Sequence, residues 1–589
     1  MSKLNIDQKS IKDLFSDSKA DFLIPDYQRP YAWGDKECQT LWDDIFAFAI
    51  PDNDYSKFNA ATDEYFLGPI VTFKNSNEKQ EIIDGQQRLT TLMLLLRAFY
   101  AKYTHMLDQQ AVKTRELISR CIWKTDEFGN PDVTALKIDS EVATDNDKEE
   151  FLSILRTGEA KKTDKSAYAQ NYRFFQEKIS EFLDRFPGYF SYLPVRILNN
   201  CILLPIEAES QDTALRIFST LNDRGKPLSD ADIFKAQFYK FYASLGKKPD
   251  FIARWRELEA LCEKIFHPIS GTPMDEIFTR YMYYERAKLG IKLSTTEALR
   301  KFYERDAYSL LKTEQTFDNL ECLATFWNDV YTQNPDRFSP DTLRRLFILN
   351  YAPNSMWTYA LSVYFMVEKD ANDQLEEDAL NIFLDRMTAF VWSYALTNPG
   401  VNALRTPIYA EMVNMINHKE VTFNGFYFEE DKLRTIFDTY SFNNGRPITR
   451  SMLAWWAMYD KEQKMPSLET VFEIEHIYAR KRQENEKSLS SDAKLESLGN
   501  KVLLESRINI RASDYRFSDK KQYYEGFITS KNVQKDPTCI HELHELVKTH
   551  SDFKEADIDA RYIAIRDAFI KFVKANNLLK VDISAVMGK

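Results

Sequence analysis

The stretch Glu81-Ile-Ile-Asp-Gly-Gln-Gln-Arg-Leu-Thr-Thr-Leu92 predicts a strand, a tight turn and a helix in quick succession. Its two isoleucines are typical of the end of a buried strand, and Asp84-Gly85 is a turn signal because glycine adopts backbone angles that other residues resist. From Gln86 onward the apolar residues recur at helical spacing. Helix N-terminal amides attract anions and Arg88 can fork onto phosphate oxygens, so this turn can cradle a phosphate. An equally weighted alternative is a structural turn in which a partly buried Arg88 pairs with Asp84.

The length and composition describe a multidomain globular protein. A chain of 589 residues is too long for one core, so two to four domains are expected. Hydrophobic residues make up 44% and charged residues 28%, which is ordinary for a folded chain. The 16 glycines are few for this length and favour long helices over many tight turns.

Charge and cysteine content narrow the possible partners and compartment. The formal net charge of -11 means that any contact with DNA must come from a local basic patch. Six scattered cysteines without a close pair exclude a zinc knuckle of the usual spacing and indicate reduced thiols. The N-terminus lacks the apolar core of a signal peptide, and no run of about twenty apolar residues occurs. We therefore expect a cytoplasmic protein that does not enter a membrane.

The order of patterns along the chain predicts a mixed N-terminal part and a helical middle. Strands are expected at 65–73, 81–83 and 199–207, and the polar segment 126–147 is expected to be an exposed excursion. A second polar loop, 222–226, lies between two predicted helices. Its Arg224-Gly225 pair either faces the same cleft as Arg88 or forms a simple helix–helix turn. From about 246 to 440 the pattern is helix after helix, with clear apolar periodicity in 251–266, 375–397 and 427–440.

The segment from Arg480 to Lys535 reverses the sign of the global charge. It holds thirteen Lys and Arg residues against eight Asp and Glu residues. Four aromatic residues are interleaved among these charges, which suits phosphate contacts with some stacking. They are Tyr515, Phe517, Tyr523 and Tyr524. The alternative is a solvated helical face, which is common for charge runs of this size.

Of the seven histidines, four belong to no pattern that can be connected to chemistry: His105, His267, His418 and His550. His541 and His544 lie one helical turn apart and could ligate a metal, but no third ligand is evident and an exposed helix face is favoured. His476 stands in Val471-Phe-Glu-Ile-Glu-His-Ile477, where strand alternation places Glu473 and Glu475 on one face and Ile474 and His476 on the other.

The residues after His476 complete a pattern that carries chemistry. Leu498-Gly-Asn-Lys-Val-Leu-Leu504 predicts a second short strand, and Arg507-Ile-Asn-Ile-Arg-Ala-Ser513 leads into a lysine-rich helical stretch. An acid–His pair followed by two asparagines is the order of a ββα-metal nuclease. A neutral histidine activates water to attack phosphorus, while a carboxylate and an amide oxygen suit Mg²⁺, which prefers oxygen ligands. Asn500 can hold the histidine ring in its working orientation.

These segments resemble the HNH nuclease motif, which also occurs in RNA-guided DNA nucleases and in the C-terminal domain of GmrSD-type restriction enzymes. The resemblance implies that His476 is the general base, that Glu475 and Asn509 are metal ligands, and that Asn500 is the structural asparagine. Two departures stand out. Many family members have Asp at the position of Glu475 and a proline shortly after the histidine, where this chain has Tyr478-Ala479.

The N-terminal half resembles the ParB-like DGQQR domain of GmrSD and related phage-defence proteins. The likeness rests on Ile24-Pro-Asp-Tyr-Gln-Arg-Pro-Tyr-Ala-Trp33, Tyr65-Phe-Leu-Gly68, Ile83-Asp-Gly-Gln-Gln-Arg-Leu-Thr-Thr91 and Phe218-Ser-Thr-Leu-Asn-Asp-Arg-Gly225. In that family the domain is implicated in nucleoside triphosphate binding and hydrolysis and in sensing DNA modification. The implied pocket consists of Gln28, Arg29, Asp84, Gly85, Gln86, Gln87, Arg88, Asn222 and Arg224, with Tyr31 or Trp33 as stacking rings.

Together these features predict a predominantly helical α+β protein of three domains. We expect a ParB-like α/β nucleotide-binding and sensor domain at 1–245, a helical scaffold at 246–440 and a ββα-metal HNH nuclease domain at 441–589. The resemblance implies a modification-dependent, type IV restriction-like endonuclease of anti-phage defence that acts on double-stranded, modified phage DNA. Its expected cofactors are Mg²⁺ or another divalent cation and GTP or another triphosphate, and a homo-oligomer is possible.

Two other functions fit the same sequence. One is a nucleotide-dependent DNA-binding or toxin-like module whose HNH domain is degenerate, and the other is an N-terminal DNA clamp without triphosphatase activity. No Gly-x-x-x-x-Gly-Lys-Ser/Thr loop occurs, so any triphosphate hydrolysis must use machinery other than a P-loop.

Overall fold

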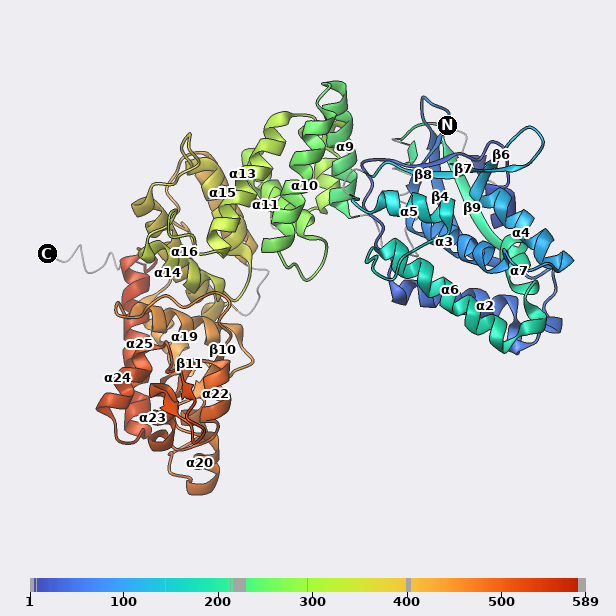
Figure 1. Cartoon of the computed structure of the whole chain (residues 1–589). Coiled ribbons are helices and arrows are strands. Elements are labelled where there is room, and N and C mark those ends of the chain that lie inside the picture. Colours follow the sequence, from blue (N-terminus) through green and yellow to red (C-terminus); the bar gives the residue numbers. More distant parts are fainter. Residues whose placement is uncertain are drawn as a thin grey trace. The chain divides into compact units, whose positions relative to one another are not determined.

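The computed structural model shows a predominantly helical α+β chain that divides into two compact units, Met1–Glu257 and Leu258–Lys589 (Figure 1). The predicted fold class is therefore confirmed. The second unit contains both the predicted helical scaffold and the predicted nuclease segment, and the boundary between these two stays a prediction. The structure describes residues 5–6, 8–142, 145–211, 213–214, 229–293, 295–398 and 404–580.

A mixed sheet organises the first unit. Within the described ranges, seven strands pair in the order β1-β9-β4-β5-β3-β8, with β2 also paired to β9. β4 runs parallel to β9 and antiparallel to β5, whereas β3 runs parallel to both β5 and β8. The strands are β1 (Asn5–Ile6), β2 (Lys9–Ser10), β3 (Phe22–Ile24), β4 (Tyr65–Lys74), β5 (Gln80–Asp84), β8 (Ile138–Ser140) and β9 (Cys201–Ala208).

The sheet confirms three predicted strands and corrects one expectation. β4, β5 and β9 fall where the apolar runs at 65–73, 81–83 and 199–207 predicted them. The segment 126–147 is not wholly an exposed excursion. Its first part forms a hairpin of β6 (Trp123–Thr125) with the largely exposed β7 (Pro131–Leu136), but β8 is buried at the edge of the main sheet. Because most residues of this segment are polar, its composition did not predict that Ile138 would be fully buried.

One central helix, α3 (Gln86–Tyr103), carries much of the first core. It is buried around most of its circumference, and it packs against α4, α5 and α6 (Figure 1). The other helices of this unit are α1 (Ile11–Phe15), α2 (Asp35–Ala49), η1 (Pro51–Asn53), η2 (Tyr55–Lys57), α4 (Gln109–Ile122), α5 (Lys148–Thr157), α6 (Ala167–Arg185), η3 (Pro187–Tyr189), α7 (Tyr192–Asn200) and α9 (Asp230–Ser244).

The second unit begins with the helical run that the sequence predicted. The periodic segments 251–266, 375–397 and 427–440 correspond to α10, α16 and α18. No helix in the described part of the chain is both long enough and apolar enough to cross a membrane. The helices are α10 (Lys248–Ile265), whose residues are shared between the two units, α11 (Pro273–Lys288), α12 (Leu299–Tyr303), η4 (Arg305–Ala307), η5 (Ser309–Leu311), α13 (Glu314–Tyr331), α14 (Pro340–Asn350), α15 (Met356–Glu368), α16 (Glu377–Thr397), α17 (Arg405–Ile416), α18 (Glu430–Thr439) and α19 (Pro447–Tyr459).

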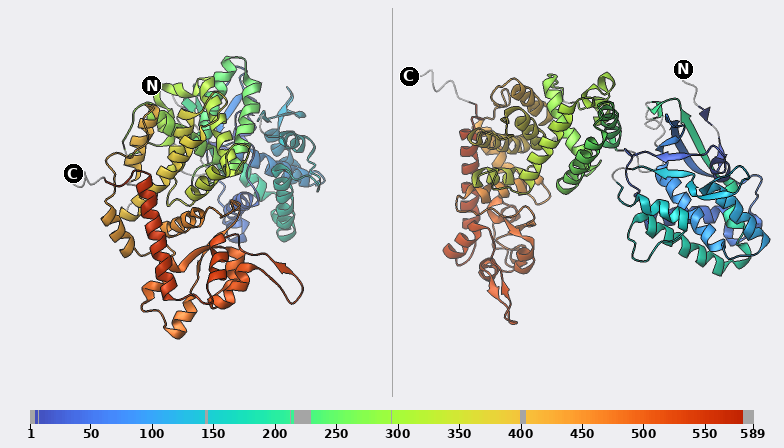
Figure 2. Two further views of the ribbon diagram at one scale, coloured as in Figure 1. Left: turned by 90° about the vertical axis from the view of Figure 1, so that its left-hand side faces the viewer. Right: turned by 45° about the horizontal axis from the view of Figure 1, so that its top comes forward.

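The C-terminal segment packs directly on these helices. α25 (Glu555–Ala575, red in Figure 2) contacts α16, α18 and η7. Shorter elements make up the rest of this segment. They are β10 (Phe472–His476), α20 (Arg480–Glu486), α21 (Asp492–Leu495), η7 (Leu498–Asn500), β11 (Lys501–Glu505), α22 (Ser506–Ala512), α23 (Phe517–Glu525), β12 (Phe527–Ile528), β13 (Gln534–Lys535) and α24 (His541–Thr549).

Candidate functional site

A strand–strand–helix arrangement carries the C-terminal motif. β10 and β11 pair antiparallel, with Glu475 opposite Val502 and His476 opposite Lys501. α22 begins at Ser506, directly after β11. This is the order of elements that the sequence predicted. Because side chains alternate along a strand, Glu475 and His476 face opposite sides of the hairpin.

His476, the last residue of β10, is held neutral in a buried position. Its side chain is 10% exposed, and the Nε2 atom is buried with no hydrogen-bond partner among the described residues. Burial lowers the pKa of the His476 imidazole to about 4, and the nearby charges of Arg480 and Lys501 act in the same direction. At neutral pH the ring is therefore uncharged and has a lone pair that can accept a proton.

The carboxylate of Glu496 lies near this nitrogen. Its Oε1 atom is 3.6 Å from His476 Nε2, beyond hydrogen-bond range, and 2.9 Å from Arg480 Nη2. Its Oε2 atom is 2.6 Å from the Nζ atom of Lys501, which is fully buried. Partial burial raises the pKa of the Glu496 carboxyl, but the hydrogen bond and charge of Lys501 outweigh this and lower it. The sequence analysis did not identify Glu496, Arg480 or Lys501 as site residues, although all three lie within the basic segment.

Asn500 shapes the loop after His476 and does not hold the ring. Its side chain is completely buried, and its Oδ1 atom accepts a hydrogen bond from the Tyr478 amide at 2.7 Å. Its Nδ2 atom donates to the carbonyl oxygens of Tyr478 and Leu495 at 3.1 and 2.9 Å. All three bonds go to the backbone, so Asn500 fixes the path of the chain that leaves β10.

α25 supports the same loop from behind. A Cβ atom on Gly499 would lie 1.9 Å from the carbonyl oxygen of Ile558, so only glycine fits against this helix. Arg561 donates to the carbonyl oxygens of Leu498 and Lys501 at 2.8 and 2.6 Å and to that of Gly499 at 3.1 Å. The long C-terminal helix therefore sets the position of the turn that presents Asn500.

Glu475 is bound on the opposite face of the hairpin. Its Oε1 atom lies 2.7 Å from Lys520 Nζ and accepts a hydrogen bond from the Tyr524 hydroxyl at 2.8 Å. Lys520 also donates to the His476 carbonyl oxygen at 2.7 Å. Burial raises the pKa of the Glu475 carboxyl, and the charge of Lys520 partly offsets this. α23 therefore positions β10 through one buried lysine and one buried tyrosine.

The donors near this hairpin suit a hard divalent cation. Both side-chain bonds to Glu475 converge on one carboxylate oxygen, and Asn509 lies partly exposed on α22. A carboxylate and an amide oxygen are the kind of ligands that Mg²⁺ takes alongside water and substrate phosphate. Among the described residues no cluster of three or more His, Cys, Asp or Glu side chains is arranged to hold a metal ion. The donor types therefore fit Mg²⁺ bound by few protein ligands, and they do not fit a closed metal cage.

The four aromatic residues singled out in the basic segment fall into two groups. Phe517 and Tyr524 are buried in the core of the unit. Tyr515 is 49% exposed and its ring stacks on that of Tyr523, with centroids 5.9 Å apart. Only the second group can meet a nucleic acid base.

The N-terminal motif forms the strand, turn and helix that its sequence predicted. β5 ends at Asp84, Gly85 has a φ of 93°, and α3 begins at Gln86. Arg88 donates from Nη1 to the Pro69 carbonyl oxygen at 2.8 Å. Burial raises the pKa of the Asp84 carboxyl, and the charges of Arg88 and then Arg29 lower it. Arg88 therefore lies beside Asp84 and is also held by β4.

Most of the polar side chains in this motif bind backbone. Gln28 donates to the carbonyl oxygens of Ile82 and Ile83 at 3.3 and 3.2 Å. Gln87 bonds the Ala32 amide and the Pro30 carbonyl oxygen, and Gln86 donates to the Arg29 carbonyl oxygen. These bonds fasten the loop 25–33 to β5 and to the N-terminus of α3.

The two predicted stacking rings are likewise part of the scaffold. The Tyr31 hydroxyl bonds Thr91 at 2.7 Å and Asn171 at 2.9 Å, and its ring stacks on that of Tyr168. Trp33 is half-buried against the core, and its carbonyl oxygen accepts a hydrogen bond from Asn171. Asn222 and Arg224, the remaining residues of the implied pocket, lie outside the described residues.

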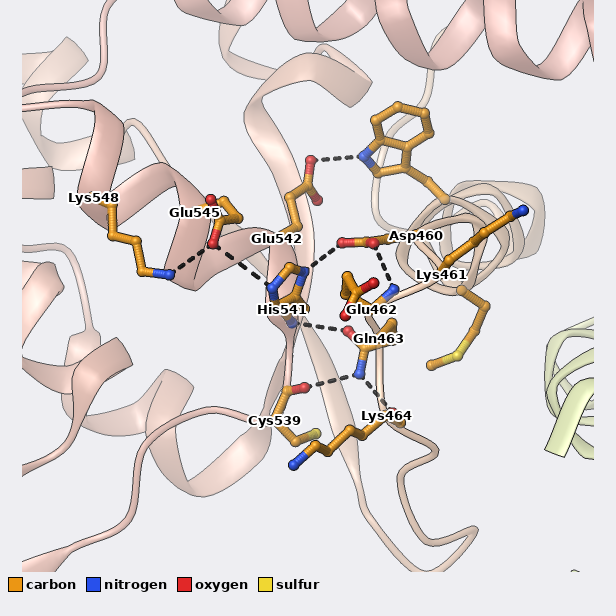
Figure 3. A network of polar contacts seen from close by, with 12 residues as sticks. Asp460, Lys461, Glu462, Gln463, Lys464, Cys539, His541, Glu542, Glu545 and Lys548 are labelled. Carbon is orange, nitrogen blue, oxygen red and sulfur yellow. Dashed lines mark hydrogen bonds and ion pairs between the residues drawn. The ribbon is translucent and has the colours of Figure 1, made fainter.

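His541 and His544 serve structural roles. His541 Nδ1 lies 2.6 Å from Asp460 and its Nε2 lies 3.7 Å from Glu545 (Figure 3). His544 Nε2 bonds the carbonyl oxygen of Thr538 at 2.8 Å. Each ring is partly buried and faces a different partner, so the two histidines do not form the exposed helix face that the sequence analysis favoured.

Comparison with known proteins gives two matches on this chain. A family model described as the N-terminal domain of the GmrSD restriction endonuclease matches residues 11–239. A second, described as the C-terminal domain of GmrSD restriction endonucleases, matches residues 427–568. A search of curated proteins finds no match. The two matched segments contain the DGQQR turn and the His476 hairpin respectively.

Proposed function

The chain belongs to the GmrSD restriction endonuclease family, and on this premise we propose that it is a modification-dependent DNA endonuclease of phage defence. A triphosphate acting at the N-terminal unit controls a divalent-metal-dependent nuclease centred on His476. A restrained nuclease is physically sensible, because uncontrolled cleavage would damage host DNA.

The observation that carries the proposal is the state of His476. The ring is buried, its Nε2 atom has no hydrogen-bond partner in the described part of the chain, and its pKa is lowered to about 4. A buried polar atom without a partner is costly, and at a histidine within the nuclease motif a role in binding or catalysis accounts for it. A neutral imidazole beside two cationic side chains can take a proton from water next to a phosphodiester.

The chain's own residues divide the work of hydrolysis. His476 accepts the proton of the attacking water, and Arg480 offers positive charge to the phosphate oxygens. Lys520 and Tyr524 orient Glu475 through the bonds described above. Glu475 and Asn509, which the family resemblance implies as metal ligands, would hold a divalent cation once Glu475 exchanges its contact with Lys520 for the ion, and the cation would supply charge stabilisation at the leaving oxygen.

The nuclease proposal is tested with His476→Ala and with His418→Ala as a matched control on an exposed histidine. We expect His476→Ala to reduce nicking of phage or plasmid DNA about a thousandfold with an unchanged circular dichroism spectrum. His418 is 76% exposed, so its replacement should leave the cleavage rate unchanged. Cleavage by His476→Ala at the wild-type rate would refute the assignment.

The triphosphate proposal rests on the N-terminus of α3. Arg88 lies beside Asp84 at the first turn of this helix, where backbone amides favour an anion. We expect Arg88→Ala to abolish phosphate release from GTP or ATP, while Arg120→Ala on the exposed surface of α4 has no effect. Absence of both binding and hydrolysis in the wild-type protein would leave the N-terminal unit as a DNA clamp.

Modification dependence is tested by comparing cleavage of modified and unmodified phage DNA with each triphosphate in turn. Chelation by EDTA should stop cleavage without unfolding the protein.

One contact favours a second candidate function, a degenerate nuclease that binds DNA without cutting it. Lys520 already neutralises Glu475 at a distance of 2.7 Å. Failure of the purified protein to nick DNA with Mg²⁺ or Mn²⁺ would support that candidate.

A further inference from the structure

We propose that Glu496 occupies the place of the DNA phosphate beside His476, and that Arg480 exchanges Glu496 for that phosphate when DNA binds. The inference rests on the proposed nuclease function of this hairpin. It adds a phosphate-binding residue and an internal competitor to the site.

Three groups that suit a phosphate converge on the Glu496 carboxylate. Arg480 Nη2 and Lys501 Nζ lie 2.9 and 2.6 Å from its two oxygens, and His476 Nε2 lies 3.6 Å from Oε1. Carboxylate and phosphate oxygens accept hydrogen bonds from the same guanidinium and ammonium donors. Glu496 therefore fills a place whose surroundings are chemically suited to a phosphodiester.

The distance between Glu496 and His476 fits a carboxylate that stands in for another ligand. At 3.6 Å the carboxylate makes no hydrogen bond to Nε2, and this buried nitrogen has no partner among the described residues. If Glu496 served to orient the ring, a bond of about 2.8 Å would be expected. The nitrogen instead lies near a carboxylate with which it makes no hydrogen bond.

Exposure shows which members of the cluster can move. The Arg480 side chain is 49% exposed and that of Glu496 is 33% exposed, whereas Lys501 is completely buried. Lys501 also donates to the Phe442 carbonyl oxygen at 2.6 Å and so retains a partner if Glu496 leaves. Two anions a few ångströms apart repel each other, so a phosphate can enter only as Glu496 turns toward solvent. Arg480 then transfers its hydrogen bond from the carboxylate to the phosphate.

The experiment measures binding of a short fluorescent DNA duplex in the His476→Ala background, where binding is separated from cleavage. Phosphate contacts are independent of sequence, so a plain duplex suffices. We expect Glu496→Gln to tighten Kd about tenfold, because it removes the competing charge and retains an acceptor for Lys501. Arg480→Ala should weaken Kd about tenfold and reduce the slope of log Kd against log salt by about one.

Two further variants keep the result interpretable. Glu430→Gln makes the same change in net charge at an exposed ion pair with Arg434, and it should leave Kd unchanged. In the Arg480→Ala background, Glu496→Gln should tighten binding less than about threefold, because the two residues act as a pair. Thermal unfolding of each variant excludes a change in fold.

The outcomes separate this inference from the proposed function. An affinity for Glu496→Gln that is unchanged within twofold, or weaker, would overturn the exchange. If Glu496→Gln does not fold, an unchanged Kd and salt slope in Arg480→Ala would overturn it instead. The proposed nuclease function is decided separately, by whether His476→Ala still cuts DNA.

Discussion

The nuclease hairpin and the DGQQR turn use their polar side chains in different ways. At the nuclease hairpin, Asn500 and Lys520 bond the backbone on either side of His476, whose buried Nε2 atom has no partner in the described part of the chain. At the DGQQR turn, Gln28, Gln87 and Tyr31 bond backbone or neighbouring side chains, and the buried Gln86 Oε1 atom has no partner among the described residues. A motif thus contains residues that build a backbone shape and residues that meet a ligand, and residue type alone does not distinguish them.

The largest effect should come from the glycine behind the nuclease loop. Gly499→Ala would place a Cβ atom 1.9 Å from the Ile558 carbonyl oxygen, so the turn and α25 cannot keep their positions. We expect a loss of about 4 kcal/mol or more in the free energy of unfolding of this region. Hydrogen exchange of peptides that cover β11 and α25 measures it.

The matching glycine of the other motif gives a smaller effect. Gly85 has a φ of 93°, and a Cβ atom there would lie 3.2 Å from Ile70 Cγ1. Gly85→Ala should cost about 1–2 kcal/mol, since the penalty is mainly that of left-handed backbone. If Gly85→Ala were the more damaging variant, the first motif would be the tighter of the two.

The same contrast explains what the sequence could predict. The strand, turn and helix around Gly85 and the alternation of Glu475 and His476 depend on neighbours in the chain, and local periodicity predicted both. Arg561 acts on residues about sixty positions away, and Glu496 reaches His476 only because the intervening chain folds back. Such contacts follow from tertiary packing, so periodicity and spacing gave no signal of them.

The bonds of Asn500 supply the second prediction. Asn500→Ala would leave one amide and two carbonyl groups unpaired in a buried loop. We expect the free energy of unfolding to fall by about 3 kcal/mol. The cleavage rate of the folded variant should fall as well, because the chain after His476 would shift. Urea unfolding and a nicking assay report the two quantities.

Asn576→Ala serves as the control for this prediction. Asn576 makes a single bond to its own helix, so its replacement should cost less than about 1 kcal/mol. A fully stable Asn500→Ala variant that no longer cuts DNA would instead place Asn500 in contact with the reacting groups.

The third prediction concerns pH. The pKa of His476 is lowered to about 4 from 6.5, so the base stays neutral well below neutral pH. Cleavage should therefore fall only as pH approaches 4. An ordinary histidine would lose activity below about 6.5. Initial rates between about pH 3 and 8 locate the midpoint, and a midpoint near 6.5 would show that the ring is not desolvated.

The same shift has a consequence for stability. Between about pH 4 and 6.5 the unfolded chain binds a proton at His476 that the folded chain does not. The free energy of unfolding should therefore be greatest above pH 6.5 and fall as pH is lowered through this window. His476→Ala should remove this part of the pH dependence.

The smallest expected effect is that of Tyr31→Phe, which tests directly whether a polar residue of the DGQQR turn belongs to the scaffold or meets the nucleotide. Tyr31→Phe keeps the ring stacked on Tyr168 but removes the hydroxyl bonded to Thr91 and Asn171. If Tyr31 belongs to the scaffold, the variant should lose about 1 kcal/mol of stability and release phosphate from GTP within twofold of the wild-type rate. If the hydroxyl meets the nucleotide, hydrolysis should drop about tenfold while stability changes little. The first result would leave Arg88, Asp84 and the buried Gln86 Oε1 atom, which has no partner among the described residues, as the groups that distinguish this turn from an ordinary one, because Gln28, Gln87 and Tyr31 would then be accounted for by the loop that they hold.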